Sequence, residues 1–219
     1  MIVNKDTNIY VGNTEIAKAY QGDMVIYEKQ PEYTEINYLE SPGYCYIQTG
    51  VIINDNKLRV QMKVEENTNY HEGFPLGGYN GRYGMGDVYG DKENYYWYFY
   101  YGDNPSIQTN LVYNPWIIDT YTLDYTLTKD TYSLTSNGET DSGTHATFVP
   151  TNSELYMFRR GTDRSYEYYG KIYYCKIYVD DVLVRDYIPV LDINNVPCMY
   201  DKVSKTYFYN QGSGQFLYG

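Results

Sequence analysis

The sequence predicts an all-β protein: an antiparallel two-sheet sandwich or jelly roll, preceded by a short N-terminal β-repeat. Two observations predict this class. Strand-like segments with alternating apolar and polar residues recur between turn residues from residue 33 onward, with no convincing helical pattern among them. The 219 residues also include 32 Tyr and 19 Gly, so part of the core must be tyrosine whose hydroxyls reach water or a partner, which thin β-layers allow.

The N-terminal repeat is short and regular. Residues 10–16 (YVGNTEI) recur ten positions later as residues 20–26 (YQGDMVI). Gly followed by Asn or Asp is a tight-turn signal, so each unit is predicted to form strand, turn and strand. Two such units are too small to bury a core alone. We therefore expect residues 1–30 to serve attachment or oligomerisation, and residues 31–219 to form the jelly-roll domain.

The predicted strands of the main domain have one apolar and one polar face. Leu58, Val60, Met62 and Val64 alternate with polar residues, a pattern typical of a strand with one buried face. Two further strands are predicted at 123–127 and 132–134, the second of them leading into an Asn137-Gly138 hairpin turn. Another is predicted at 171–179, followed by an Asp180-Asp181 turn. Its shared apolar face is expected to contain Tyr173, Cys175, Ile177 and Val179.

An aromatic run organises the middle of the chain. Residues 95–101 (YYWYFYY) are predicted to form a strand, with Trp97 on one face and Tyr96, Tyr98 and Tyr100 on the other. In one interpretation the Trp97 face is core and the tyrosine face is half exposed. In the other, Tyr96, Tyr98 and Tyr100 also form an exposed platform for a sugar ring or a partner protein.

A Gly-rich stretch at residues 74–90 precedes that run. It is interpreted either as two sandwich strands joined by a tight loop, or as an adaptable loop whose Tyr79, Asn80 and Tyr83 bind a ligand. Gly84 and Gly86 do not indicate a phosphate loop, because no strand-to-helix transition and no Gly-Lys-Ser/Thr follow them.

Charge and cysteine content restrict the partners and the compartment. The net charge of −11 repels phosphate backbones, so nucleic acid is not expected as a partner. Cys45, Cys175 and Cys198 are odd in number and lack metal-ligand spacing, so we expect neither a disulfide framework nor a zinc site. His71 and His145 are expected to be solvated loop residues. No segment is apolar enough for a signal or a membrane span, and we expect synthesis in a reducing cytoplasm.

Four segments carry a family resemblance. Residues 32–50, 183–192, 196–202 and 207–214 resemble the opening and closing strands of concanavalin-A-like, laminin-G-like jelly rolls, in a variant familiar from phages and prophages of gut bacteria. The N-terminal units resemble short repeats of phage tail and virion-appendage proteins. The resemblance implies a noncatalytic virion protein: a head fibre, decoration protein or tail appendage.

The resemblance also implies partners. Residues 1–30 would contact other virion proteins, a homo-oligomer is expected with a trimer favoured, and the jelly roll would bind a host-surface glycan or protein. The protein would then be located in the virion. The alternatives are a glycan-binding module of a bacterial surface protein and, less favoured, a glycan hydrolase.

Neither a catalytic site nor a metal site is predicted. Jelly-roll glucanases resembling this architecture place catalytic carboxylates at alternating positions of one strand. The nearest acidic run here, at 139–141, is predicted to lie in a turn and lacks a third acid. Asn54, Asp55, Asn56, Asp119 and the Asp180-Asp181 pair offer oxygen ligands for calcium, but no fixed spacing connects them. We therefore expect no cofactor, and the spacing of these Asn and Asp residues does not support a calcium site.

Overall fold

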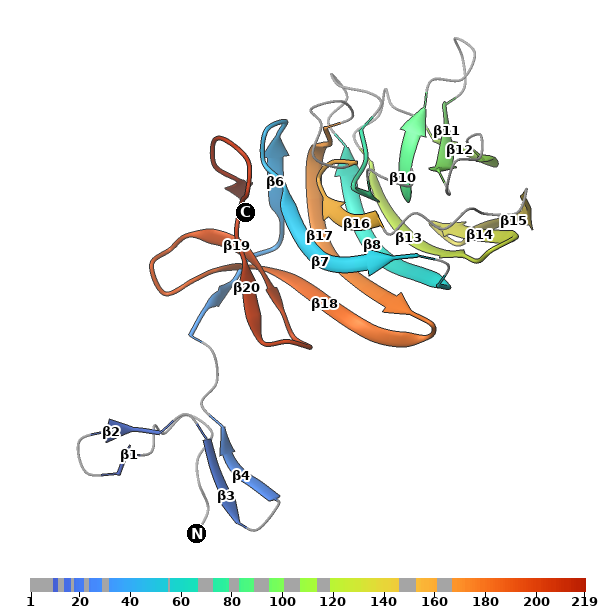
Figure 1. Cartoon of the computed structure of the whole chain (residues 1–219). Coiled ribbons are helices and arrows are strands. Elements are labelled where there is room, and N and C mark those ends of the chain that lie inside the picture. Colours follow the sequence, from blue (N-terminus) through green and yellow to red (C-terminus); the bar gives the residue numbers. More distant parts are fainter. Residues whose placement is uncertain are drawn as a thin grey trace. The chain divides into compact units, whose positions relative to one another are not determined.

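The computed structural model describes residues 10–11, 14–16, 18–21, 24–28, 32–54, 56–66, 73–78, 83–88, 95–100, 107–113, 119–145, 153–160 and 167–219 (Figure 1). The chain forms two compact units, Met1–Tyr33 and Thr34–Gly219. Within the described ranges the regular structure is strand throughout, so the predicted all-β class is confirmed. The same ranges contain no helix with the length and apolar character needed to cross a membrane.

The N-terminal unit consists of two small hairpins. β1 (Tyr10–Val11) pairs with β2 (Thr14–Glu15), and β3 (Lys18–Gln21) pairs with β4 (Met24–Glu28), both antiparallel. The strand pairs predicted from the repeat are confirmed in both copies, and the predicted Gly-Asn and Gly-Asp turns at 12–13 and 22–23 lie outside the described residues.

The larger sheet of the main unit has eleven antiparallel strands. Its main path runs β15-β14-β13-β8-β17-β18-β19-β20; β5 pairs with β18, and β6 pairs with β17 and β21. The opening and closing segments of the domain therefore meet in one sheet. The strands are β5 (Thr34–Glu35), β6 (Leu39–Pro42), β8 (Leu58–Glu66), β13 (Thr120–Leu127), β14 (Thr131–Ser136), β15 (Glu139–Thr144), β17 (Tyr169–Val179), β18 (Val182–Leu191), β19 (Pro197–Asp201), β20 (Thr206–Phe208) and β21 (Leu217–Tyr218).

The smaller sheet has six antiparallel strands in the order β12-β11-β10-β9-β16-β7. Its strands are β7 (Ile47–Ile53), β9 (Leu76–Gly78), β10 (Tyr83–Val88), β11 (Tyr95–Tyr100), β12 (Ile107–Tyr113) and β16 (Ser153–Met157). The Gly-rich stretch thus supplies two neighbouring strands, β9 and β10, as one of its two interpretations predicted.

The core lies between the two sheets. Leu58, Val60, Met62 and Val64 of β8 are at most 1% exposed, which confirms the predicted buried face. From the smaller sheet, β11 contributes two buried aromatic residues that contact rings of β13: Trp97 lies 5.5 Å from Tyr121 and Phe99 lies 5.3 Å from Tyr125, between ring centroids. The assignment of Trp97 to the core is therefore confirmed. On the other face of β11, Tyr96 and Tyr98 are half-buried.

Strand β17 differs from its predicted face pattern. Ile172 is the partner of Val64 but Tyr174, not Tyr173, is the partner of Lys63, so the strand carries a β-bulge at this point. The extra residue shifts the alternation, and Ile172 replaces Tyr173 in the buried set that includes Cys175 and Ile177. The prediction that Tyr173 shares the face of Cys175 is wrong for this reason. Cys175 itself is fully buried, as predicted, and its burial raises the pKa of the thiol.

The tight turns follow their sequence signals, with one change of boundary. Asn137 and Gly138 have φ of 49° and 91°, and Asp180 and Asp181 have φ of 49° and 64°, the left-handed values that two-residue hairpin turns require. The first turn ends at Gly138, and the acidic run 139–141 belongs to strand β15. The prediction that this run lies in a turn is therefore wrong, because the two-residue turn leaves it paired with β14.

Candidate functional site

The outward face of the larger sheet carries polar residues in straight rows across four strands. In one row, Asp124 of β13 is the partner of Gln61 of β8, Gln61 is the partner of Lys176 of β17, and Lys176 is the partner of Asp186 of β18. In the neighbouring row, Thr122, Lys63 and Tyr174 are partners in the same way. Since adjacent strands lie about 4.8 Å apart, the longer row crosses roughly 14 Å of the sheet.

A cleft of about 440 Å³ lies over these rows, and this volume is within the range of small-molecule sites. Tyr174 is the aromatic member of its lining, and it is half-buried. Burial raises the pKa of Tyr174, and the nearby Asp124 carboxylate raises it further, so the hydroxyl is a donor at neutral pH. The residues lining the cleft are Gln61, Thr122, Leu123, Asp124, Tyr174, Lys176, Asp186, Ile188 and Lys202.

One wall of the cleft is a hydrogen-bonded network around Asp124. Arg59 donates from Nε to Oδ1 at 2.9 Å and from Nη2 to Oδ2 at 2.7 Å, and Gln61 donates to Oδ2 at 2.8 Å. Tyr178 in turn donates its hydroxyl to Gln61 Oε1 at 3.1 Å. The hydrogen bond from Arg59 lowers the pKa of Asp124 against the opposing effect of burial. Both planar groups, the carboxylate and the amide, are therefore held in fixed orientations before any ligand arrives.

The other wall is built around Asp186. Its backbone N–H donates to Asp201 Oδ1 at 2.7 Å, and its carbonyl accepts from the backbone N–H of Lys202 at 2.9 Å. Lys176 Nζ is 4.0 Å from the Asp186 carboxylate, too long for a strong pair, and both groups line the cleft. This wall therefore offers one carboxylate and two ammonium groups on a backbone that the buried Asp201 fixes.

The β17 bulge places a second tyrosine beside the cleft. Tyr173 donates its hydroxyl to Glu65 at 2.8 Å, and Lys63 Nζ lies 4.7 Å from the Tyr173 ring centroid. Burial raises the pKa of Glu65, but hydrogen bonds from Lys171 and Tyr173 outweigh it, so the net shift is downward. The network keeps Tyr173 engaged and leaves Tyr174 as the ring that lines the cleft.

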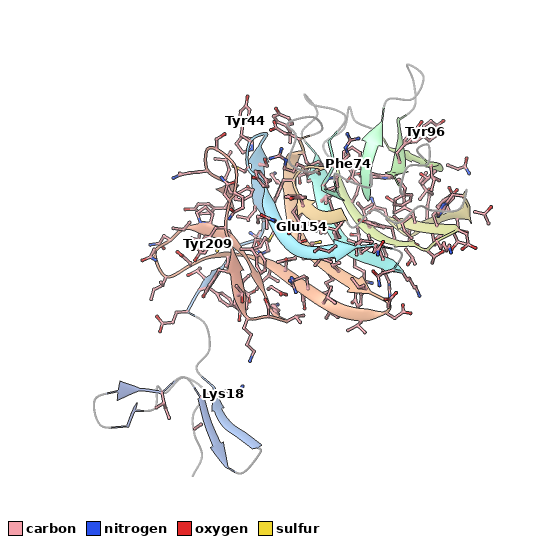
Figure 2. All side chains as sticks on the ribbon, in the orientation of Figure 1. Lys18, Tyr44, Phe74, Tyr96, Glu154 and Tyr209 are labelled. Carbon is pink, nitrogen blue, oxygen red and sulfur yellow. The ribbon has the colours of Figure 1, made fainter. Side chains whose placement is uncertain are left out.

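The residues predicted as a binding platform belong to the other sheet. Tyr96 and Tyr98 are half-buried on β11, and Tyr100 ends that strand. Tyr83 begins β10, where its Cα partner is Gly78, while Tyr79 and Asn80 lie outside the described residues. The structure brings none of the described members into the cleft over β8 and β17. Figure 2 labels Tyr96 among the side chains of the smaller sheet.

The groups considered for calcium or catalysis have structural partners. Asp180 accepts from Asn56 Nδ2 at 2.6 Å and from the backbone N–H of Lys57 at 2.9 Å, and Asp119 accepts from Thr120 N–H at 2.7 Å. Asp141 accepts from the Tyr132 hydroxyl at 3.2 Å. Asp55 and His71 lie outside the described residues, among which no group of three or more His, Cys, Asp or Glu side chains is arranged to hold a metal ion.

Comparison with known proteins supports the fold. No family model matches the sequence, and no curated protein matches it. Among solved structures, a putative carbohydrate-binding protein from Bacteroides ovatus ATCC 8483 aligns with a TM-score of 0.53 at 12% identity, covering 84% of this chain and 60% of that one.

Two other solved structures are similar. Domain 4 of AbnA, an extracellular GH43 arabinanase from Geobacillus stearothermophilus, aligns with a TM-score of 0.50 at 14% identity over 69% of this chain and 77% of its own. Domains LG4-5 of the mouse laminin alpha1 chain align with a TM-score of 0.46 at 14% identity, over 69% and 44%. At these identities the likeness to AbnA domain 4 and to the Bacteroides ovatus protein shows the fold alone: an antiparallel two-sheet jelly-roll sandwich, as the sequence predicted.

Proposed function

We propose that this chain is a noncatalytic carbohydrate-binding jelly roll, which holds a glycan in the cleft lined by Tyr174 and is displayed on a phage particle. The observation that carries the proposal is the row of Asp124, Gln61, Lys176 and Asp186 next to the Tyr174 ring. A sugar presents an apolar ring face and hydroxyls that both donate and accept hydrogen bonds. An aromatic ring beside fixed carboxylate, amide and ammonium groups matches both properties.

The charge of the protein points to a neutral glycan. The net charge of −11 repels polyanionic ligands over the whole surface. Within the cleft, two carboxylates and two ammonium groups nearly balance one another. Two proteins with this fold also have sugar-related descriptions: AbnA domain 4 was solved in complex with arabinotriose, and the Bacteroides ovatus protein is a putative carbohydrate-binding protein.

The virion role rests on the sequence resemblance and on the N-terminal unit. Among the described residues, each of the two hairpins is a two-stranded sheet in a separate unit, which suits a segment that mounts the jelly roll on other virion proteins or on further copies of itself, with a trimer favoured. Head fibre, decoration protein and tail appendage all fit this arrangement. The alternative, a glycan-binding module of a bacterial surface protein, would use the same cleft.

A glycan array probed with the full chain tests the binding proposal. The best ligand is then titrated against Tyr174→Ala, with Tyr218→Ala as the matched control, since Tyr218 is 49% exposed on β21 and does not line the Tyr174 cleft. We expect Tyr174→Ala to weaken binding roughly 30-fold, the equivalent of about 2 kcal/mol for an aromatic anchor, and Tyr218→Ala to leave it unchanged. Equal affinity for both variants would contradict the assignment of the cleft.

Two further measurements address the remaining parts of the proposal. Mass spectrometry of purified phage particles should detect the chain among the virion proteins, and its absence there would favour the bacterial alternative. Prolonged incubation of the bound glycan with the protein should yield no cleavage products. Release of shorter sugars that depends on Asp124 or Asp186 would instead identify a hydrolase.

A further inference from the structure

We propose a second carbohydrate site in the loop cleft, defined here by Tyr44, Tyr46, Arg159, Glu167 and Gln211. This cleft has a volume of about 370 Å³ and shares no lining residue with the Tyr174 cleft. It adds a site to the proposed glycan-binding function and does not depend on the Tyr174 cleft. Its ligand is a neutral sugar residue, for reasons that follow from its two walls and its charged groups.

The first wall is an exposed tyrosine on a constrained turn. Tyr44 is 54% exposed, between β6 and β7, and Figure 2 labels it at the margin of the main unit. Gly43 has φ of 111°, and a Cβ there would lie 1.9 Å from the Tyr169 ring, so only glycine fits this turn. A large ring is thus held open to solvent by a turn that tolerates little change, which is the arrangement of a stacking surface rather than of a core residue.

The second wall is a C-terminal segment locked to the first. Asn210 Oδ1 accepts from the backbone N–H groups of Tyr46 at 3.1 Å and Gly212 at 2.8 Å, and the Gln211 N–H donates to the Tyr46 carbonyl at 2.9 Å. A Cβ on Gly212 would lie 1.9 Å from the Tyr44 carbonyl oxygen, so the two backbones are in contact. Because both walls are fixed to each other, binding a ligand between them requires little further ordering of the loops and so little loss of conformational entropy.

The charged groups of the loop cleft define the class of ligand. Arg159 is 6% exposed, its guanidinium carbon lies 4.2 Å from the Tyr46 ring centroid, and its backbone bridges to that of Glu167. A guanidinium supplies donors only and a carboxylate supplies acceptors only, so together they match neighbouring sugar hydroxyls. A polyanionic ligand would meet Glu167 and the net charge of −11, and a cationic ligand would meet Arg159, which leaves a neutral sugar.

The test uses the full chain with arabinotriose, cellotriose and chitotriose as probes, followed by backbone NMR shifts and calorimetry. At least one probe should shift the amide signals of Gln211 and Gly212. Tyr44→Ala should abolish those shifts and weaken that site at least about tenfold, while the shifts at Lys176 and the thermal midpoint stay unchanged. Tyr174→Ala should have the complementary effect, and Tyr218→Ala should change neither site.

The outcomes for the two sites are separable. If none of the three sugars shifts Gln211 or Gly212, or if Tyr44→Ala leaves those shifts intact, the second site is overturned, whether or not the Tyr174 cleft binds. If no probe shifts the amide signal of Lys176 in any variant, the result counts against the Tyr174 cleft alone. If Tyr44→Ala alters the turn, a second variant, Gln211→Ala, tests the loop cleft instead. This variant replaces an exposed side chain and should also abolish the amide shifts at the loop cleft.

Discussion

Truncating Trp97 to Ala should destabilise the main unit more than any change on the opposite face of the same strand. Trp97 is 1% exposed, and its ring meets Tyr121 of the facing sheet edge-on, at 5.5 Å and 78°. Removing a buried ring of this size costs about 3–5 kcal/mol, of which the ring pair accounts for about 0.5–1.5 kcal/mol. For a chain of this length each kcal/mol lowers the midpoint by about 2–4 °C, so the melting temperature should fall by roughly 6–20 °C.

Urea unfolding followed by circular dichroism measures the loss, with Tyr98→Ala as the matched control. Tyr98 is half-buried on the outward face of β11, so its truncation should cost less than half as much. If Tyr96, Tyr98 and Tyr100 form the binding platform considered from the sequence, Tyr98→Ala should in addition weaken ligand binding while the domain stays folded. A larger loss for Tyr98→Ala than for Trp97→Ala would refute the reasoning, because it would place the supporting contacts on the outward face.

Three further predictions concern other parts of the molecule. Asp201→Ala should cost about 3 kcal/mol or more in unfolding free energy, because the fully buried carboxylate accepts from the N–H groups of Asp186, Val203 and Ser204, which would lose their partner. Asp201→Asn should recover part of the loss, and equal stability of Asp201→Ala and the parent would disprove the role. The lowered pKa of Asp124 means that its stabilisation is present above the unfolded pKa near 4 and is lost as pH falls through the folded pKa. Below pH 4 the unfolding free energy of Asp124→Asn, measured with urea, should therefore fall less than that of the parent, by under about 1 kcal/mol, and parallel pH profiles would exclude the effect. A chain beginning at Tyr33 should fold, as judged by a cooperative melt, but should sediment as a monomer and fail to join particles; an insoluble product would instead make residues 1–30 part of the core.

The strands and the buried faces could be predicted because they depend on local alternation. The period of two identified the core faces of β8 and β13, and the Asn137-Gly138 and Asp180-Asp181 pairs identified two hairpin turns. The bulge in β17 could not be read in the same way. Residues 171–179 contain aromatic or apolar side chains at most positions, so shifting the alternation by one residue leaves an equally plausible strand. The adjacent pair Tyr173-Tyr174 was the one local sign that the alternation breaks.

The Tyr174 cleft was missed because its members become neighbours only through strand pairing. Gln61, Asp124, Lys176 and Asp186 lie on four strands, and each sits in an ordinary polar position of its own strand. Their row exists because the registers of three strand pairs coincide. Sequence patterns within one strand specify which face a residue occupies but not which residues face it across the sheet. The aromatic run at 95–101 could be found because its residues are consecutive, and its strand, β11, belongs to the smaller sheet.

The register of the smaller sheet places glycine residues opposite tyrosine residues on neighbouring strands. Gly86 is the Cα partner of Tyr98, and Gly84 is the partner of both Tyr100 and Gly77. Because glycine has no side chain, Gly86 leaves the area of the sheet face opposite Tyr98 available to that ring. In this pair tyrosine supplies the ring on the sheet face, and glycine on the neighbouring strand adds no side chain beside it. The half-buried ring of Tyr98 can therefore lie along the outward face of β11 without a place in the apolar interior between the two sheets.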